Sequence, residues 1–266
     1  MRIRLDELLV LRSFVANIAE AQACILAGEV LVNDERKTHV GEKFPSDAAI
    51  RMKKQSKYAS RGGFKLEGAL QSFEFDVSGL SCADFGASTG GFTDCLLQHG
   101  AASVCAIDVG YGQLAWKLRS DERVKVVDKC NVRTATVEEI GADYDLVVAD
   151  LSFIRLSAVL PTMFAALSPL GALVTLVKPQ FEVQSEELDN HGVVTSAQAH
   201  IDVLKSVCKA ACSCGFKVED VCASPIKGPE GNIEFFLYAT KPLQSSDASS
   251  IDDARIIHVV EHAHAK

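Results

Sequence analysis

The chain has 266 residues, 48% hydrophobic and 23% charged, and a formal net charge of −8. These values are typical of a globular protein with one large core and a small appended domain. A membrane-spanning chain is excluded, because no apolar run approaches the ~18–20 residues that cross a bilayer. The charged start also lacks a signal-peptide core, so we expect a cytoplasmic protein with no membrane part.

The nine cysteines indicate a reducing compartment. They are odd in number, form no Cys-x-x-Cys pair and mostly stand inside apolar runs, where cysteine serves as a small hydrophobic residue. Cys208, Cys212 and Cys214 are close enough to suggest a metal site. On a helix, however, Cys214 points away from the other two, and no paired histidines complete a ligand set. We therefore expect no metal.

The first residues predict a small α+β domain, which we place at residues 1–59. Leucines at 5, 8 and 9 predict a helix over residues 4–12, and Asn17 with Glu20 predicts the start of a second helix that ends near Gly28. Residues 29–34 predict a strand, with residues 49–52 as its partner. Residues 1–65 carry a net charge of +4, whereas the remainder carries −12. A phosphate-bearing partner is therefore expected to dock here.

This domain resembles the small RNA-binding domain named after a primary-binding ribosomal protein of the small subunit. The matching residues are Arg4-Leu5-Asp6, Ala21-Gln22, Ala27-Gly28, Val30, Val32-Asn33 and the stretch from Lys37 to Lys43. The usual Ser-Arg pair before the second helix is replaced by Ala16-Asn17, so one expected phosphate contact is missing. The resemblance implies RNA contacts by Arg4, Arg12, Lys37 and, beyond the domain, Arg61. The alternative is a charged helical face that is merely solvated.

A basic, glycine-containing stretch over residues 53–63 follows, and we place the linker between domains at residues 60–63. Its charge would suit an RNA backbone passing between the domains. A helix is expected from Phe64 to Phe73, as the start of a large domain over residues 64–241. The tail over residues 242–266 is expected to be poorly ordered, with a loose helix over residues 256–264.

The stretch from Asp84 to Asp94 predicts a strand, a glycine-rich turn and the start of a helix. Glycines remove side chains where a ligand could lie against the backbone, and the N–H groups of the helix start can bind it. The spacing is neither Gly-x-Gly-x-x-Gly nor that of a phosphate loop, which disfavours those two cofactor classes. The predicted cofactor contacts are Asp84, Gly86, Ser88, Thr89, Gly90, Gly91 and Phe92.

Asp108 stands 22 positions after Gly86, at the end of a second apolar run. An acid at this place can accept hydrogen bonds from ribose hydroxyls, which indicates a nucleoside without saying which one. Asp128, at the end of the third run, is expected to join the same site. Taken alone, the glycine-rich turn could be an ordinary tight connection between a strand and a helix. Together with Asp108, it favours a cofactor site.

Further strands are expected over residues 124–127, 144–150, 170–177, 215–218 and 233–238, with a short helix opening at residues 109–114 and a longer one over residues 196–213. This alternation predicts an α/β fold, a doubly wound, mostly parallel Rossmann-like sheet with its ligand at the carboxyl ends of the strands. Asp150 and Lys178 end neighbouring strands there, and Lys65 and Glu234 could complete a set of two lysines and two acids. Scattered charged residues usually lie on the surface, but the position of these residues at strand ends favours a catalytic role.

These four residues have the order and context of the Lys-Asp-Lys-Glu tetrad of FtsJ-like ribose 2′-O-methyltransferases. The segments around them resemble the TlyA, or hemolysin-A-like, ribosomal RNA methyltransferases; they span residues 58–63, 84–94, 108–114, 149–153, 177–182 and 225–234. The resemblance implies S-adenosylmethionine as cofactor and methyl donor. It also implies cytidine 2′-hydroxyls of ribosomal RNA as acceptors, in the large subunit and possibly also the small one.

Two alternatives belong to other classes of protein. A membrane-active hemolysin would need apolar or amphipathic spans, and none of convincing length is present. A non-catalytic ribosome assembly factor would have lost its site, yet all four tetrad residues and the glycine turn are present. For the enzyme, Lys178 is the expected base, with Asp150 holding its ammonium and Lys65 and Glu234 orienting the ribose. If the acids keep Lys178 charged, Lys178 instead orients the hydroxyl and Asp150 takes the proton.

Overall fold

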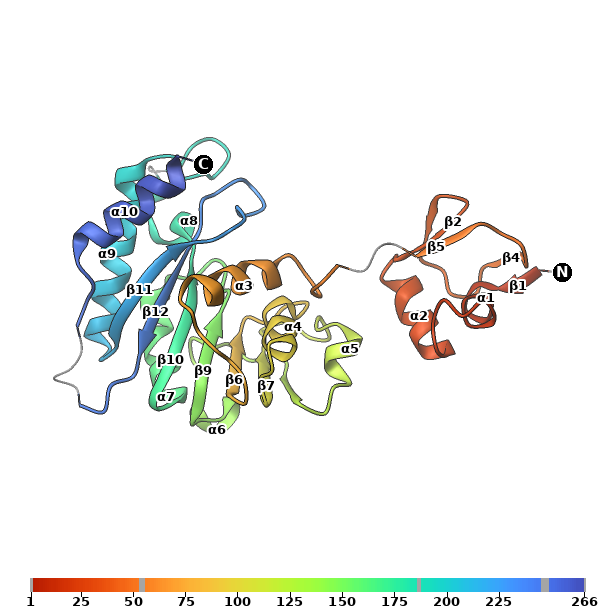
Figure 1. Ribbon diagram of the computed structural model, residues 1–266, viewed down its shortest axis with the longest axis horizontal. Helices are drawn as coiled ribbons and strands as arrows, with labels where there is room; N and C mark the ends of the chain where they lie inside the picture. Colours follow the sequence, from red (N-terminus) through yellow and green to blue (C-terminus); the bar gives the residue numbers. More distant parts are fainter. Residues whose placement is uncertain (1, 53–55, 186–187, 245–248, 266) are drawn as a thin grey trace. The chain divides into compact units, whose positions relative to one another are not determined.

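The computed structural model describes residues 2–52, 56–185, 188–244 and 249–265, and the chain divides into two compact units, residues 1–57 and 58–266 (Figure 1). Lys53 and Lys54, which belong to the basic stretch predicted over residues 53–63, lie outside the described residues. Residues 62 and 63, predicted as linker, are instead the first turn of a helix, α3 (Gly62–Ser72). Glycine at both positions weakened the helical pattern, so the sequence placed the start of this helix too late.

The first unit combines two short helices with two small antiparallel sheets. Its elements are β1 (Arg2–Arg4), α1 (Leu5–Leu11), α2 (Ile18–Leu26), β2 (Val30–Val32), β3 (Glu35–Lys37), β4 (Lys43–Pro45) and β5 (Ile50–Met52). Strand β2 lies between β3 and β5, and β1 pairs with β4. The side chain of Asn17 accepts a hydrogen bond from the Glu20 N–H and caps α2, as its sequence predicts. Leu5, Leu8 and Ile25 are fully buried between the helices and β2.

The second unit is built on one seven-stranded sheet with the order β11-β12-β10-β9-β6-β7-β8. All neighbours pair in parallel except β12, which runs antiparallel to both β10 and β11. The strands are β6 (Ser81–Phe85), β7 (Ser103–Ile107), β8 (Val124–Val127), β9 (Tyr144–Ala149), β10 (Leu167–Val177), β11 (Lys217–Ala223) and β12 (Phe235–Thr240). This arrangement confirms the doubly wound, mostly parallel sheet.

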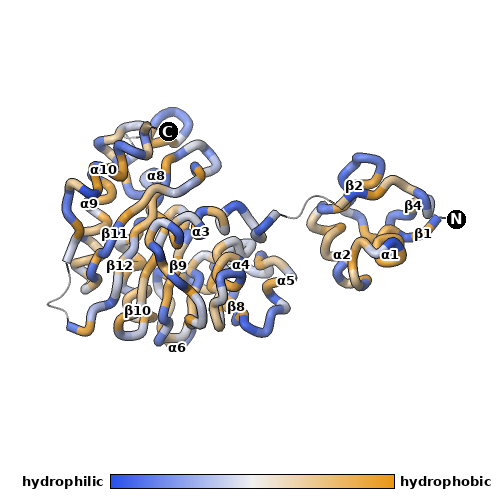
Figure 2. The backbone as a smooth tube through the Cα atoms, in the orientation of Figure 1, coloured by the Kyte–Doolittle hydropathy of each residue, from blue (hydrophilic) through white to orange (hydrophobic). Residues whose placement is uncertain are grey.

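Helices cover both faces of this sheet, because its strands are hydrophobic on both sides. One face packs on α3, α4 (Gly91–Gln98) and α5 (Trp116–Arg119). The other packs on α6 (Val137–Ile140), α7 (Leu160–Ala166), α9 (Ala197–Ser213) and α10 (Asp253–His264). Further short helices among the described residues are η1 (Leu156–Ala158) and α8 (Pro179–Glu182). Figure 2 shows the hydrophobic colours gathered in central strands such as β9 and β10.

Helix α5 begins at Trp116, so the short helix predicted to open at residues 109–114 begins later. Asp108 explains the difference, because its Oδ1 accepts a hydrogen bond from the Gly110 N–H at 2.7 Å and turns the chain away from a helical path. Gly112 follows with a φ of +68°, in the left-handed region that ends regular helix. The segment between β7 and α5 is therefore a loop.

The helix near the end of the tail, α10, is packed and not loose, because it contacts α9 and β11. Ile256, Val259 and Val260 have the i, i+3, i+4 spacing of one helix face, and all three are buried. Arg255 also forms an ion pair with Asp220 on β11 at 2.7 Å. Residues 245–248 of the predicted disordered stretch lie outside the described residues. Within the described ranges, every helix falls short of the length and apolarity needed to cross a membrane.

Candidate active site

The site lies at the carboxyl ends of the adjacent strands β6 and β9, where the strand order of the sheet reverses. Ligands of doubly wound sheets bind at this switch point. Gly86 follows β6 with a φ of +84°, and a Cβ placed on it would stand 2.8 Å from the backbone oxygen of Asp150. Only glycine allows the turn to pass this close to the end of β9, so Gly86 has a steric reason besides any ligand.

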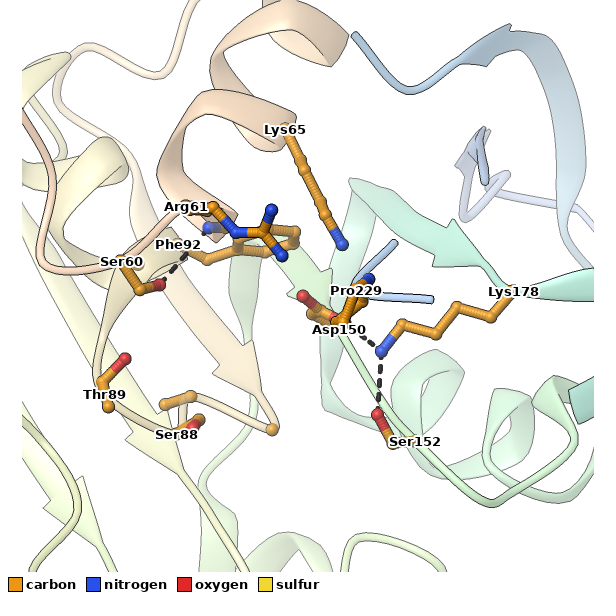
Figure 3. Close-up of a pocket in the computed structure, with 14 residues that line it drawn as sticks. Ser60, Arg61, Lys65, Ser88, Thr89, Phe92, Asp150, Ser152, Lys178 and Pro229 are labelled. Atoms are coloured by element: carbon orange, nitrogen blue, oxygen red, sulfur yellow. Dashed lines mark hydrogen bonds and ion pairs between the residues drawn. The ribbon is translucent and has the colours of Figure 1, made fainter. Parts of the chain in front are cut away.

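A cavity of about 410 Å³ opens beside this turn. It is lined by Ser60, Arg61, Gly62, Lys65, Gly86, Ala87, Ser88, Thr89, Gly91, Phe92, Asp150, Ser152, Lys178 and Pro229 (Figure 3). Five of the predicted cofactor contacts therefore line it, namely Gly86, Ser88, Thr89, Gly91 and Phe92. Its other wall carries charged side chains from α3 and from the ends of β9 and β10.

Gly90 is required by its left-handed backbone, with a φ of +95°, and Gly91 by packing within the protein. A Cβ on Gly90 would come 2.2 Å from Leu118 of α5, and Gly90 does not line the cavity. A Cβ on Gly91 would come 2.2 Å from Ser60 Oγ and 2.9 Å from the backbone nitrogen of Gly63. Gly91 thus lets the start of α4 approach the start of α3. Gly91 therefore brings two parts of the cavity lining together, whereas Gly90 faces α5 outside it.

Asp84, predicted as a cofactor contact, is fully buried and does not line the cavity. Its Oδ2 accepts hydrogen bonds from the backbone N–H of Thr93 at 2.9 Å and from Thr93 Oγ1 at 2.7 Å. Asp84 therefore ties the end of β6 to α4 beneath the glycine turn. Burial raises the pKa of Asp84 to about 7, against the opposing effect of the two Thr93 hydrogen bonds.

This raised pKa predicts how Asp84 affects stability. Between pH 4 and 7 the folded protein holds a proton that the unfolded chain releases, so the contribution of Asp84 is lost as pH rises through about 7. Asp84→Asn removes this titration. The stability of the wild type relative to D84N should therefore fall between about pH 4 and 7, by at most about 1.4 kcal/mol per pH unit, and level off at higher pH. Urea unfolding at several pH values measures it, and parallel stability curves for the two proteins would contradict it.

Asp108 and Asp128, which were predicted to contact the nucleoside part of a cofactor, are not among the residues that line the cavity. Asp108 Oδ2 accepts a hydrogen bond from the Ser88 N–H at 2.8 Å, so this carboxylate holds the turn. Asp128 forms an ion pair with Arg119 at 2.7 Å, and a hydrogen bond from Arg119 lowers the pKa of Asp128. The structure thus links Asp108 directly to the turn, whereas Asp128 is engaged with α5.

The first charged pair of the cavity joins the ends of β9 and β10. Lys178 Nζ lies 2.6 Å from Asp150 Oδ1 in an ion pair and donates a hydrogen bond to Ser152 Oγ at 2.8 Å (Figure 3). Both partners are acceptors, which suits the ammonium form of the lysine. The Lys178 and Asp150 side chains remain 12% and 23% exposed, so a molecule in the cavity can reach them.

The second charged pair is deeper and joins α3 to the start of the last strand. Lys65 Nζ lies 2.6 Å from Glu234 Oε2, with side-chain exposures of 8% and 0%. Gln180 Nε2 approaches the other oxygen of Glu234 at 3.5 Å. The structure therefore brings together all four residues of the predicted tetrad, as two lysine–acid pairs, with Lys65, Asp150 and Lys178 on the cavity wall.

Several lining residues were missed by the sequence reasoning, above all Ser152 and Ser60. Ser152 stands two positions after Asp150, and its closeness in sequence to an acid at a strand end was the signal that could have identified it as a site residue. Phe153 follows it with a φ of +62° and is 90% exposed, with its ring 4.9 Å from that of Phe181. A large aromatic residue is rarely left-handed or exposed, so the segment after β9 has an unusual conformation.

The predicted RNA-binding residues of the first unit have partners within it. Arg4 donates to both carboxylate oxygens of Asp6, at 3.1 and 2.8 Å, and holds the pKa of Asp6 down at about 2. Lys37 lies 2.9 Å from Glu35. Arg12 donates to a neutral group, the backbone oxygen of Ala48, at 2.6 Å. In the second unit, Arg61 lines the cavity.

A glycine-rich turn at the switch point of a doubly wound sheet, beside two lysine–acid pairs, defines this unit as a Rossmann-like domain with a ligand site at its strand ends. A solved structure described as an S-adenosylmethionine-dependent methyltransferase of Listeria monocytogenes has this fold, with a TM-score of 0.52 and 15% identity over 68% of this chain and 98% of that one. Residues 58–241 match the FtsJ-like methyltransferase family, to which the chain belongs.

Relatives of this chain are similar over nearly its whole length. The 16S/23S rRNA (cytidine-2′-O)-methyltransferase TlyA of Mycobacterium tuberculosis is 43% identical, over 95% of this chain and 96% of that protein. Hemolysin A of Brachyspira hyodysenteriae is 39% identical, over 88% and 98% respectively. A solved structure described as a hemolysin of Streptococcus thermophilus covers 99% of this chain and 96% of its own, with 38% identity and a TM-score of 0.75. These relatives confirm the resemblance to the TlyA group.

Proposed function

We propose that this protein transfers a methyl group from S-adenosylmethionine to the ribose 2′-oxygen of a cytidine in ribosomal RNA. The observation that carries the proposal is the pair of Lys178 and Asp150, partly exposed on the wall of a cavity whose opposite wall is the glycine turn. Donor and acceptor groups would meet between these walls. A ribosomal RNA substrate also implies action in the cytoplasm, where ribosomes are.

The cavity fits the proposed donor. Its volume of about 410 Å³ lies within the range of small-molecule sites. Gly86 and Gly91 leave backbone on its wall, and Ser88 and Thr89 add hydroxyl groups able to hydrogen-bond polar atoms of a nucleoside or an amino acid. Bound there, S-adenosylmethionine supplies an activated methyl group on a sulfonium. The residues of the turn would hold it and exclude water.

The charged pair would act on the acceptor hydroxyl. Lys178 is held by two acceptors, Asp150 and Ser152, and we assign it the role of orienting the hydroxyl and stabilising the negative charge that develops on its oxygen. Asp150 then accepts the hydroxyl proton. The pair of Lys65 and Glu234 lies deeper and is proposed to orient the ribose. These assignments choose between the two roles that the sequence left open for Lys178.

The choice of acceptor rests on relatives and on chain organisation. The name of the Mycobacterium tuberculosis relative specifies cytidine 2′-oxygens of 16S and 23S rRNA as its targets. The first unit, which resembles an RNA-binding domain, would be superfluous for a small-molecule acceptor. A 2′-hydroxyl within a helix is also poorly accessible, so the target nucleotide is expected to leave its stack on binding.

The test is to incubate the protein and labelled donor with unmethylated ribosomal subunits, then digest the RNA and identify the product by mass spectrometry. We expect 2′-O-methylcytidine. A substrate with 2′-deoxycytidine at the target should not be methylated, because it lacks the accepting oxygen. A base-methylated product, or full activity on the deoxy substrate, would overturn the proposal.

We expect Arg12 to contribute more to RNA affinity than Arg4 does. Arg4 is neutralised by Asp6, whereas the partners that the described residues give Arg12 are uncharged, a carbonyl oxygen and the Phe14 ring, so its charge is available to a phosphate. Arg12→Ala should therefore reduce the slope of log K against log salt concentration by about one. Arg4→Ala should reduce it by less and serves as the matched control. Binding titrations across salt concentrations measure both, and an unchanged slope for R12A would contradict phosphate binding by the first unit.

A further inference from the structure

The first residues of the segment that follows β9 are held by contacts with the start of α8. This segment carries Asp150 and Ser152, and both side chains contact Lys178, the residue that precedes α8, at 2.6 and 2.8 Å. A little further along, the ring of Phe153 packs on that of Phe181. The positions of the proposed reacting groups therefore depend on how this segment lies against α8.

Glu182 holds the last residue of the same segment, Leu156, by a hydrogen bond. It is the last residue of α8, and its Oε1 accepts a hydrogen bond of 2.7 Å from the backbone N–H of Leu156. Leu156 begins η1 and is only 3% exposed, so water has little access to that N–H. Burial raises the pKa of Glu182, which the Leu156 hydrogen bond and the charge of Arg155 partly offset. The half-buried carboxyl group of Glu182 is partly desolvated, and it accepts the hydrogen bond of the Leu156 N–H.

The conformation between these two ends needs such restraint. Phe153 is in the left-handed region, with a φ of +62°, although it is neither glycine nor asparagine. Its side chain is 90% exposed, so burial in the core does not hold it in place. A strained residue keeps its conformation only where its surroundings impose it. Here the surroundings are α8, through Lys178 on one side and Glu182 on the other.

We propose that Glu182 is a positioning residue for methyl transfer: its hydrogen bond to the Leu156 N–H keeps the segment of residues 150–156 in place, so that Asp150 and Ser152 stay against Lys178. This inference rests on the proposed function for its kinetic consequence. Its structural part, the fastening of the segment by Glu182, stands independently of any reaction.

Two conservative variants separate the hydrogen bond from the charge. Glu182→Asp keeps the charge but shortens the side chain, so the bond to Leu156 is lost. Glu182→Gln keeps the length and the accepting oxygen but removes the charge. Tyr144→Phe is the matched control, because it deletes another buried hydrogen bond, from the Tyr144 hydroxyl to the Ile140 oxygen, at the opposite end of β9.

We expect E182D to lower kcat by about 10- to 100-fold, the effect of a small misplacement of reacting groups, with the KM for the donor unchanged. E182Q should stay within about threefold of the wild type, and so should Y144F. Hydrogen exchange supplies a readout that needs no activity. Amides of residues 151–158 should exchange faster in E182D, but not in E182Q or Y144F.

Two results would overturn the inference. One is exchange over residues 151–158 that is equal in E182D and the wild type, whatever the activity. The other is a kcat loss in E182Q as large as in E182D, which would make the charge and not the hydrogen bond decisive. A wild type that fails to methylate RNA would refute the proposed function instead, and the exchange measurement would still decide whether Glu182 fastens the segment.

Discussion

Replacing Lys178 by alanine is expected to lower kcat for methyl transfer by about 10²- to 10⁴-fold, the range of general acid–base groups, while donor affinity stays within about threefold. Lys178 faces the acceptor side of the cavity and pairs with Asp150 and Ser152. The glycine turn that we assign to the donor is on the other wall, so donor binding does not depend on the lysine. Single-turnover kinetics and calorimetry measure the two quantities separately.

The control for this substitution is Lys209→Ala, which removes an exposed lysine from α9, on the other face of the sheet. It should leave both kcat and donor affinity unchanged. If K178A kept turnover within a factor of about ten of the wild type, neither role considered for Lys178 would be tenable. A parallel loss of donor binding would instead place Lys178 on the donor side.

Two further variants decide which residue takes the proton. Arginine remains charged at any practical pH and cannot act as a base, but it can stabilise a developing negative charge. If Asp150 is the proton acceptor, Lys178→Arg should keep measurable activity and Asp150→Asn should lose it as fully as K178A. If Lys178 is the base, K178R should be as inactive as K178A. The pair of variants thus separates the two interpretations that the sequence alone leaves open.

The sequence predicted the placement of Asp150 and Lys178 well, for a simple geometric reason. Parallel neighbouring strands end at the same edge of a sheet, so residues that follow β9 and β10 must lie close together. The same reasoning located the glycine turn at the end of β6. Strand ends are visible in sequence as the points where apolar runs stop, and this is why the fold and the position of the site could be inferred.

Side-chain direction could not be inferred in the same way. Asp84 adjoins the glycine turn in sequence, yet it points into the protein and binds Thr93, because α4 covers that face of β6. Arg4 belongs to a basic stretch, yet Asp6 neutralises it two positions later. Partners of this kind depend on rotamers and on local packing. The pattern of residue types in the sequence does not contain this information.

The long-range contacts of the site were invisible for another reason. Glu182 binds a backbone N–H 26 positions earlier, and a backbone group has no signature in the sequence. Lys65 and Glu234 are 169 positions apart, and only their order within a tetrad hinted at their proximity. The structure adds that these two residues form the most deeply buried ion pair of the cavity region. That burial has a measurable consequence.

Glu234→Ala is expected to destabilise the protein by about 3–5 kcal/mol, because it leaves the ammonium of Lys65 buried without its partner. The two side chains are 8% and 0% exposed and lie 2.6 Å apart. The double variant K65M/E234L replaces both charges by apolar groups of similar size, so it should recover most of this loss and remain inactive. Urea unfolding measures the stability, and the transfer assay the activity.

An exposed ion pair of the same length provides the control. Lys205 and Asp253 also lie 2.6 Å apart, but their side chains are 36% and 64% exposed. Water screens this pair and can solvate Lys205 once Asp253 is removed, so Asp253→Ala should cost only about 0–1 kcal/mol. A loss for E234A no larger than that for D253A would mean that water reaches Lys65 in the folded protein. Its proposed part in orienting the ribose would then lack the rigid, dry surroundings on which it depends.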